Sequence, residues 1–168
     1  MQWMRTFFGL LLGCCVLAAP VYALSLNHAQ QCLRSDIDQV LRGADPYSLI
    51  DADPILATVT GRAYLRYSTE QKQQARTALR QTVQALAAQL RARYASIKVY
   101  STSRPQKANG PYYKVSGEVL IDGMSYRYEA FLRAYGRQAC RYREVRVAIR
   151  RLTTAVRDHH LMNRFAAR

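Results

Sequence analysis

The chain has 168 residues, and its 25 Lys and Arg against 11 Asp and Glu give it a formal net charge of +14. This length predicts a single domain that can bury about two-thirds of its unfolded surface, so no second domain is expected. The charge indicates an anionic neighbour, either a membrane surface or an acidic partner, whereas the export signal described next argues against nucleic acid.

Residues 1–23 have the pattern of a secretory signal. One Arg precedes an apolar run at residues 6–19, and residues 21–23 form a small-x-small cleavage site. The run is shorter than the about 20 residues that a membrane span needs. We therefore expect residues 24–168 to be the exported domain. A lipoprotein is the alternative, because Leu11-Leu12-Gly13-Cys14 resembles a bacterial lipoprotein processing box.

Helical signals fill the first part of the expected domain. Apolar residues at helical spacing predict an amphipathic helix over Leu24–Leu41, which Asp45-Pro46 terminates. Residues 47–67 are expected to form one or two short helices, with Pro54 in a first turn and Asp53 as the cap.

The clearest single element is a long helix from Thr69 to Tyr94. Ser68 and Gln71 fit a capping box, and neither Gly nor Pro interrupts the segment. At 1.5 Å per residue the helix is about 39 Å long, enough to cross a small sheet. Its apolar stripe consists of Ala75, Leu79, Val83, Leu86, Leu90 and Tyr94.

The period of the pattern then changes to that of β-strands. Residues 97–100 begin a strand, residues 103–111 form a loop, and residues 112–133 predict a β-hairpin around Asp122-Gly123, a favoured type I′ turn. The register follows from the two-residue turn: Ile121 opposes Met124, Val119 opposes Tyr126, Gly117 opposes Tyr128, Val115 opposes Ala130, and Tyr113 opposes Leu132. We expect Gly117 to leave a gap beside Tyr128 on the concave side of the sheet.

A third sheet strand is expected from Ala139 to about Ile149. Its apolar face changes phase, which predicts a β-bulge near Arg143-Glu144. Residues 152–165 follow as a closing helix, with Leu152, Val156 and Phe165 facing inward. Helices followed by an antiparallel meander make an α+β domain, in which the helices, the long one included, pack on a strongly bent sheet as a cone.

Two cysteines remain after the signal, Cys32 and Cys140. In an exported chain such a pair predicts a disulfide, worth about 4–5 kcal/mol in the chain-entropy model, and two separate buried thiols are the alternative. No metal site is expected, because His28, His159 and His160 are not spaced to supply further ligands.

Signals for catalysis are weak. The chain has no nucleophile-elbow, zinc-protease, P-loop or dinucleotide motif, so neither an enzyme nor a cofactor is predicted. Asp36 with Asp38, or Asp51 with Asp53, could be paired carboxylates of a hydrolase, but residues two apart on a helix point to different sides. Solvated helix surface is the simpler interpretation.

Arginines gather on the third strand. Arg141, Arg143 and Arg146 are either a solvated sheet face or a contact for anionic headgroups or an acidic partner, in which case each exposed Arg contributes about 1 kcal/mol near an anionic leaflet.

Several stretches together resemble a known family. Residues 53–64, the sequence Tyr67-Ser68-Thr69-Glu70-Gln71 and the long helix ending in Tyr94-Ala95 are similar to the MlaC-type periplasmic phospholipid-binding proteins of the toluene-tolerance family. The resemblance implies a nuclear-transport-factor-like cone in the periplasm, which takes up phospholipid tails and shuttles the lipid between membrane-associated complexes.

The same resemblance implies which residues contact the lipid. The apolar pocket would be lined by Val83, Leu86, Leu90, Val115, Val119, Tyr126, Tyr128 and Val147. The alternative is a cone with a filled core that acts as a non-enzymatic basic adaptor or assembly subunit in the cell envelope. An internal cavity of several hundred Å³ would separate the two hypotheses.

Overall fold

The computed structural model describes residues 23–148, 150–159 and 162. The predicted signal up to Tyr22 and the predictions that concern Ile149, His160 and Phe165 therefore lie outside the described residues.

The first helix, α1 (Leu26–Leu41), is confirmed, and its N-cap Ser25 accepts a hydrogen bond from the His28 N–H. A 3₁₀ turn, η1 (Pro46–Leu49), then leads into α2 (Ala52–Thr60) and α3 (Ala63–Arg66).

The prediction that Asp53 caps α2 is wrong. Asp51 holds the N-cap position, and Asp53 lies in the first turn, where its carboxylate pairs with Arg76 at 2.8 Å. Asp51 also pairs with an arginine, Arg133, at 2.7 Å, and its side chain makes no capping hydrogen bond.

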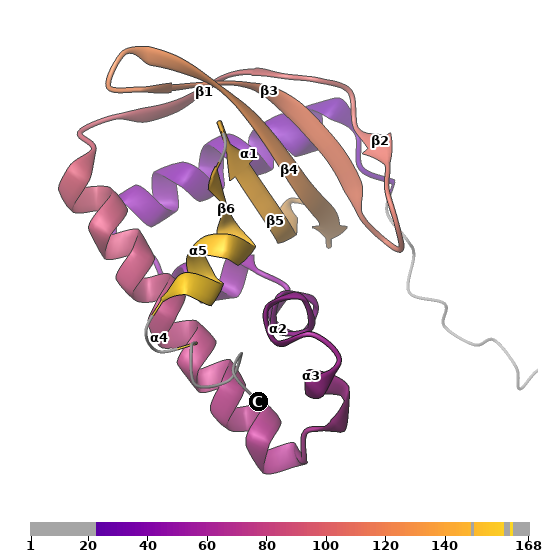
Figure 1. The fold of residues 1–168 in the computed structure, drawn as a ribbon. Helices are drawn as coiled ribbons and strands as arrows, with labels where there is room; N and C mark the ends of the chain where they lie inside the picture. The colour runs from indigo at the N-terminus through magenta and orange to yellow at the C-terminus, as the bar shows by residue number, and fades with distance from the viewer. Residues whose placement is uncertain (1–22, 149, 160–161, 163–168) are drawn as a thin grey trace, which may run out of the picture.

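The long helix α4 (Thr69–Arg93) begins with the predicted capping box. The Gln71 N–H donates to the Ser68 hydroxyl at 3.2 Å, and the Ser68 N–H donates to the Gln71 side chain at 2.9 Å. The helix packs mainly against η1, α1, α2 and α5, and its end reaches β1 (Figure 1).

The predicted hairpin forms strands β3 (Tyr113–Ile121) and β4 (Met124–Tyr135) in the predicted register. Asp122 and Gly123 both have positive φ, 49° and 83°, as a type I′ turn requires. The Asp122 carboxylate also accepts the N–H groups of Ala95 and Ser96 at 3.0 and 2.8 Å, which ties the turn to the end of α4.

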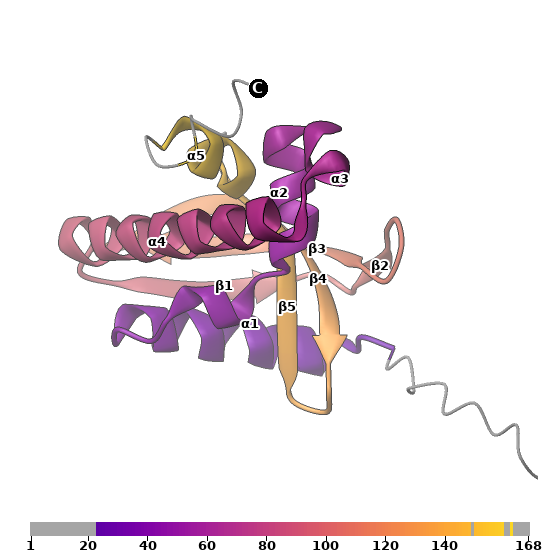
Figure 2. The ribbon, with the colours of Figure 1, turned by 90° about the horizontal axis from the view of Figure 1, so that it is seen from below.

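The antiparallel sheet has the order β1-β3-β4-β5-β6, with β2 beside β3. Its remaining strands are β1 (Ile97–Thr102), β2 (Gln106–Lys107), β5 (Ala139–Val147) and β6 (Arg150–Arg151). The two-residue strands β2 and β6 were not predicted, because two residues carry too little periodicity to be recognised. Figure 2 shows β1 running across the direction of β5, so the sheet is strongly bent.

The bulge in β5 is confirmed. Phe131 opposes Glu144 while Leu132 opposes Tyr142, which leaves Arg143 as the extra residue. The bulge restores a common apolar face for the two halves of β5.

Gly117 does not border an open gap, contrary to the prediction. A Cβ at this position would collide with the backbone carbonyl of Ser101 on β1, and the same carbonyl accepts the Tyr128 hydroxyl at 3.1 Å. Glycine is therefore required for the close approach of two strands.

The closing helix α5 (Leu152–Asp158) ends before the predicted segment does, with His159 as its C-cap. Val156 is fully buried, as its inward position predicted. Together with the bent antiparallel sheet, the five α-helices found in the described residues confirm the predicted α+β class.

The predicted disulfide joins Cys32 on α1 to Cys140 on β5, with 5.9 Å between the two Cα atoms. It fixes α1 to the sheet.

The buried apolar residues form two clusters, one between α1 and the sheet and the other among α2, α4, α5 and Ile50.

Candidate ligand-binding cavity

An apolar cavity of about 570 Å³ lies between the two clusters and is partly open to solvent. Its volume falls within the roughly 300–1,000 Å³ of small-molecule sites. The walls come from α1, η1, α4 and the concave face of β1, β3, β4 and β5, and Ala148, Arg150 and Leu152 complete the lining.

Seven of the eight residues predicted to contact lipid line this cavity: Val83, Leu86, Leu90, Val119, Tyr126, Tyr128 and Val147. Val115 is not among the lining residues, because it is fully buried in the cluster between α1 and the sheet. Sequence analysis did not assign lining residues to α1 or η1, although Leu33, Ile37 and Leu49 contribute to the wall. The helical periodicity of α1 could have suggested that stripe.

Only two lining residues carry a charge, Asp36 and Arg150. Asp36 is half-buried on α1, and its Oδ2 accepts a 2.7 Å hydrogen bond from the hydroxyl of Tyr142, which is buried on β5. Burial raises the pKa of Asp36, although the hydrogen bond from Tyr142 opposes that effect. Burial and the adjacent Asp36 carboxylate hold the pKa of the Tyr142 phenol well above its usual range.

The hydroxyl of Tyr128 is also engaged by the protein, with Thr102 at 2.9 Å and the Ser101 carbonyl at 3.1 Å. Tyr128 and Tyr142 therefore contribute mainly ring surface to the cavity, as amphipathic side chains do when their polar ends are satisfied.

The predicted headgroup arginines do not line the cavity. Arg141 lies over the Tyr135 ring at 4.1 Å, Arg143 lies over the Tyr112 ring at 4.9 Å, and Arg146 pairs with Glu129 at 3.5 Å. Arg143 and Arg146 instead border a separate polar hollow of about 350 Å³. The arginine at the apolar cavity is Arg150, which was not among the predicted headgroup contacts.

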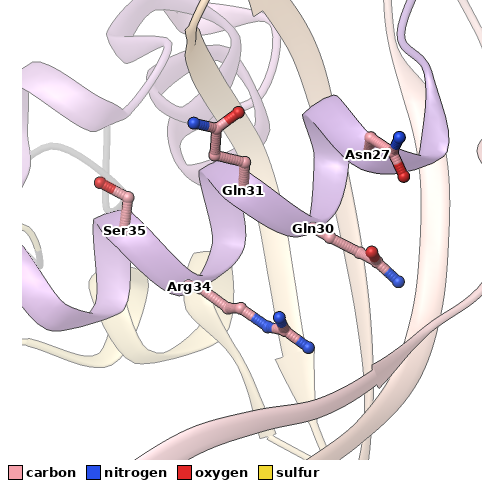
Figure 3. Close-up of a pocket in the computed structure, with 5 residues that line it drawn as sticks. All are labelled: Asn27, Gln30, Gln31, Arg34 and Ser35. Carbon is pink, nitrogen blue, oxygen red and sulfur yellow. The ribbon is translucent and has the colours of Figure 1, made fainter.

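A third hollow, of about 420 Å³, is lined by Asn27, Gln30, Gln31, Arg34 and Ser35. Figure 3 shows that all five side chains project from the single helix α1. With no second element to enclose a ligand, this polar surface is a weaker candidate than the apolar cavity.

The early aspartates are not all solvated, contrary to the simpler interpretation of the sequence. Asp51 is buried and accepts hydrogen bonds from Arg133 at 2.7 and 2.8 Å and from the Tyr112 hydroxyl at 2.8 Å. Its own N–H donates to the Tyr142 carbonyl at 2.9 Å, so the group links α2 to the sheet. Asp53 likewise accepts from Arg76 and from the Tyr64 hydroxyl.

His28 lies beside the disulfide, a proximity that sequence spacing did not reveal. A ring nitrogen of His28 and the sulfurs of Cys32 and Cys140 lie within 4.8 Å of one another. His28 and Cys32 are one turn apart on α1, and the fold brings Cys140 to them. Both sulfurs are used in the disulfide, so they offer no thiolate ligands in this state.

Within the part of the chain that the structure describes, no helix has the length and apolar content needed to cross a membrane.

The structure is thus that of an α+β domain with an open apolar cavity on the concave side of its sheet. Among solved structures the chain is similar to a phospholipid-binding protein from Ralstonia solanacearum, determined in complex with a phospholipid. The TM-score is 0.56 at 14% sequence identity, and the match covers 77% of this chain and 83% of that chain. No protein-family model matches the chain, and no curated protein sequence matches it.

Proposed function

We propose that the protein is a non-enzymatic carrier that binds a phospholipid, or another long-chain amphiphile, with its hydrocarbon in the apolar cavity. The observation that supports this proposal most directly is the cavity itself, of about 570 Å³, in which all but two of the lining residues are uncharged. The similarity of fold to a protein solved with bound phospholipid adds support.

The driving force for binding is burial of the hydrocarbon. Each methylene removed from water contributes about 0.8 kcal/mol. Leu86 and Leu90 on α4 and Ile121 on β3 offer aliphatic contacts from opposite walls of the cavity. Because the site is built between two apolar clusters, an acyl chain completes packing that the protein's own side chains leave open.

The carrier role extends the proposal to location and partners. The signal pattern of residues 1–23 supports export to the periplasm, where a carrier would exchange lipid with membrane-associated complexes. The Arg143 guanidinium contacts the Tyr112 and Phe131 rings, at 4.9 and 5.5 Å, and Arg143 is not among the cavity-lining residues. We assign Arg141, Arg143 and Arg146 to docking on an acidic partner surface rather than to the ligand headgroup.

The alternative function, an adaptor with a filled core, does not agree with the open cavity. The carrier proposal keeps one part of this alternative, the docking of the basic residues on β5 to an acidic partner. Reversing the charges of Arg143 and Arg146 should weaken association with an acidic envelope partner and reduce its salt dependence, while lipid uptake stays unchanged.

The decisive experiment is extraction of the purified protein followed by lipid mass spectrometry, together with uptake from liposomes and re-isolation of the protein. About one lipid per protein is expected in both measurements. A protein that leaves its expression host empty and takes up nothing from liposomes would rule the carrier function out.

A further inference from the structure

Asp36 differs from the four aspartates that follow it up to Asp53, because each of those forms an ion pair with an arginine and Asp36 does not. Asp45 pairs with Arg80 at 2.6 Å, and Asp51 and Asp53 each pair with an arginine at 2.7 and 2.8 Å. Among the described residues, no Lys or Arg forms an ion pair with Asp36, although the chain carries 25 basic residues. The fold therefore places a carboxylate without an ion-pair partner on the wall of an apolar cavity.

The hydrogen bonds of Asp36 leave one of its oxygens available. Oδ2 accepts the Tyr142 hydroxyl at 2.7 Å, whereas Oδ1 has no hydrogen-bond partner among the described residues. Asp36 is half-buried on the cavity wall, and its Oδ1 is not fully buried, so this oxygen remains accessible to a ligand. Because the surrounding wall is largely apolar, a hydrogen bond from a ligand to this oxygen is electrostatically stronger than the same bond in water.

Apart from Asp36, the lining residues of α1 and η1 are all apolar: Leu33, Ile37, Val40, Leu41, Pro46 and Leu49. The other charged lining residue, Arg150, is exposed and carries the opposite charge. The cavity thus combines one anionic acceptor, one exposed cation and an otherwise uncharged, largely apolar lining.

We propose that Asp36, held by Tyr142, accepts an N–H hydrogen bond from the head of the ligand, and that the cavity selects amphiphiles bearing a primary ammonium group. This inference rests on the proposed carrier function and narrows its ligand class. For a phospholipid, the chemistry favours an ethanolamine head over a choline head. Both heads carry a positive charge, but the fully methylated nitrogen of choline has no N–H to donate.

Selectivity for ethanolamine is measured in one competition. The full-length exported protein is incubated with vesicles containing equal amounts of phosphatidylethanolamine and phosphatidylcholine with identical acyl chains, re-isolated, and extracted for lipid mass spectrometry. We expect ethanolamine lipid to exceed choline lipid by at least about tenfold, which corresponds to about 1.4 kcal/mol. Equal uptake of the two lipids overturns the inference and leaves the carrier function standing, whereas uptake of neither contradicts the carrier function itself.

Variants then assign the selectivity to Asp36. Asp36→Asn removes the charge at nearly constant shape and should bring the two lipids to within about twofold of each other. Asp38→Asn is the matched control, because Asp38 lies two residues away on α1, is 58% exposed, and is absent from the lining. It should keep the preference. Retained selectivity in a folded Asp36→Asn protein would refute the assignment. An alkylamine added as competitor shows whether the ammonium alone is recognised.

Discussion

Replacing Val119 by Trp tests whether the cavity is the ligand site. Val119 lies on β3 with 3% of its surface exposed and lines the cavity. Val115 lies four residues earlier on the same face of the same strand, is fully buried, and is absent from the lining. The two valines therefore differ mainly in whether empty space or packed side chains lie in front of them.

The expected magnitudes follow from that difference. At Val119 the indole brings about seven more heavy atoms into the cavity, and if each displaces one methylene of a bound chain, the lost burial is about 5–6 kcal/mol. A chain that shifts within the cavity recovers part of this loss, so we expect affinity to fall by at least about tenfold. The free energy of unfolding should change by less than about 1 kcal/mol, because the ring occupies open space.

At Val115 the same substitution meets a packed core. Overpacking of this kind costs about 1–3 kcal/mol, and more where the backbone cannot move. Val115→Trp should therefore lower stability, while the lipid uptake of its folded fraction is largely retained.

The assay combines liposome uptake, read by lipid mass spectrometry, with urea unfolding of both variants and the parent protein. Two results would refute the reasoning. A folded Val119→Trp protein that binds lipid as tightly as the parent would move the ligand elsewhere. Equal destabilisation by the two substitutions would indicate that the space in front of Val119 is already filled.

Three further predictions concern the frame around the cavity. Burial alone would raise the pKa of Asp51, but hydrogen bonds from arginine and tyrosine outweigh it and hold the pKa below its ordinary value. The stabilising contribution of Asp51 is thus present above its unfolded-state pKa and is lost as the pH falls through its lower folded-state pKa. Asp51→Asn should flatten this acid loss in pH-dependent unfolding and cost about 3 kcal/mol at pH 7. Reducing the Cys32–Cys140 disulfide, which spans 108 residues, should lower stability by about 4–5 kcal/mol in urea titrations with and without reductant. Gly117→Ala should cost about 1–3 kcal/mol in thermal unfolding because its Cβ meets the Ser101 carbonyl, and a change under about 0.5 kcal/mol would contradict that contact.

Local signals predicted most of the fold. Asp122-Gly123 determined the turn, the two-residue loop determined the register, and the alternation of apolar residues determined which face is buried. The capping box at Ser68 and the phase change at Arg143 were equally readable, because each depends on residues a few positions apart. These features were predicted correctly because near neighbours in the sequence are sufficient to define them.

Features that depend on distant residues were not predictable in the same way. Asp53 was misread as a cap because Arg76, its partner, lies 23 residues away. Gly117 was misread as a gap because the occupying carbonyl, that of Ser101, belongs to another strand. Asp36 was considered only as a catalytic candidate, since neither its place on the cavity wall nor its contact with Tyr142 leaves a trace in local periodicity.

The cavity itself follows from how the apolar residues are divided. Leu33 and Val119 belong to the cluster between α1 and the sheet, whereas Val83 belongs to the cluster of α2, α4 and α5. Leu90 and Tyr94, at the end of α4, pack against the first cluster, and the middle of the helix packs within the second. The disulfide fixes α1 to the sheet, and the Asp51–Arg133 ion pair fixes the start of α2 to the sheet. Both links are made without side chains filling the space between the two clusters. A protein stabilised at its edges in this way can keep its centre open for a ligand that arrives after folding.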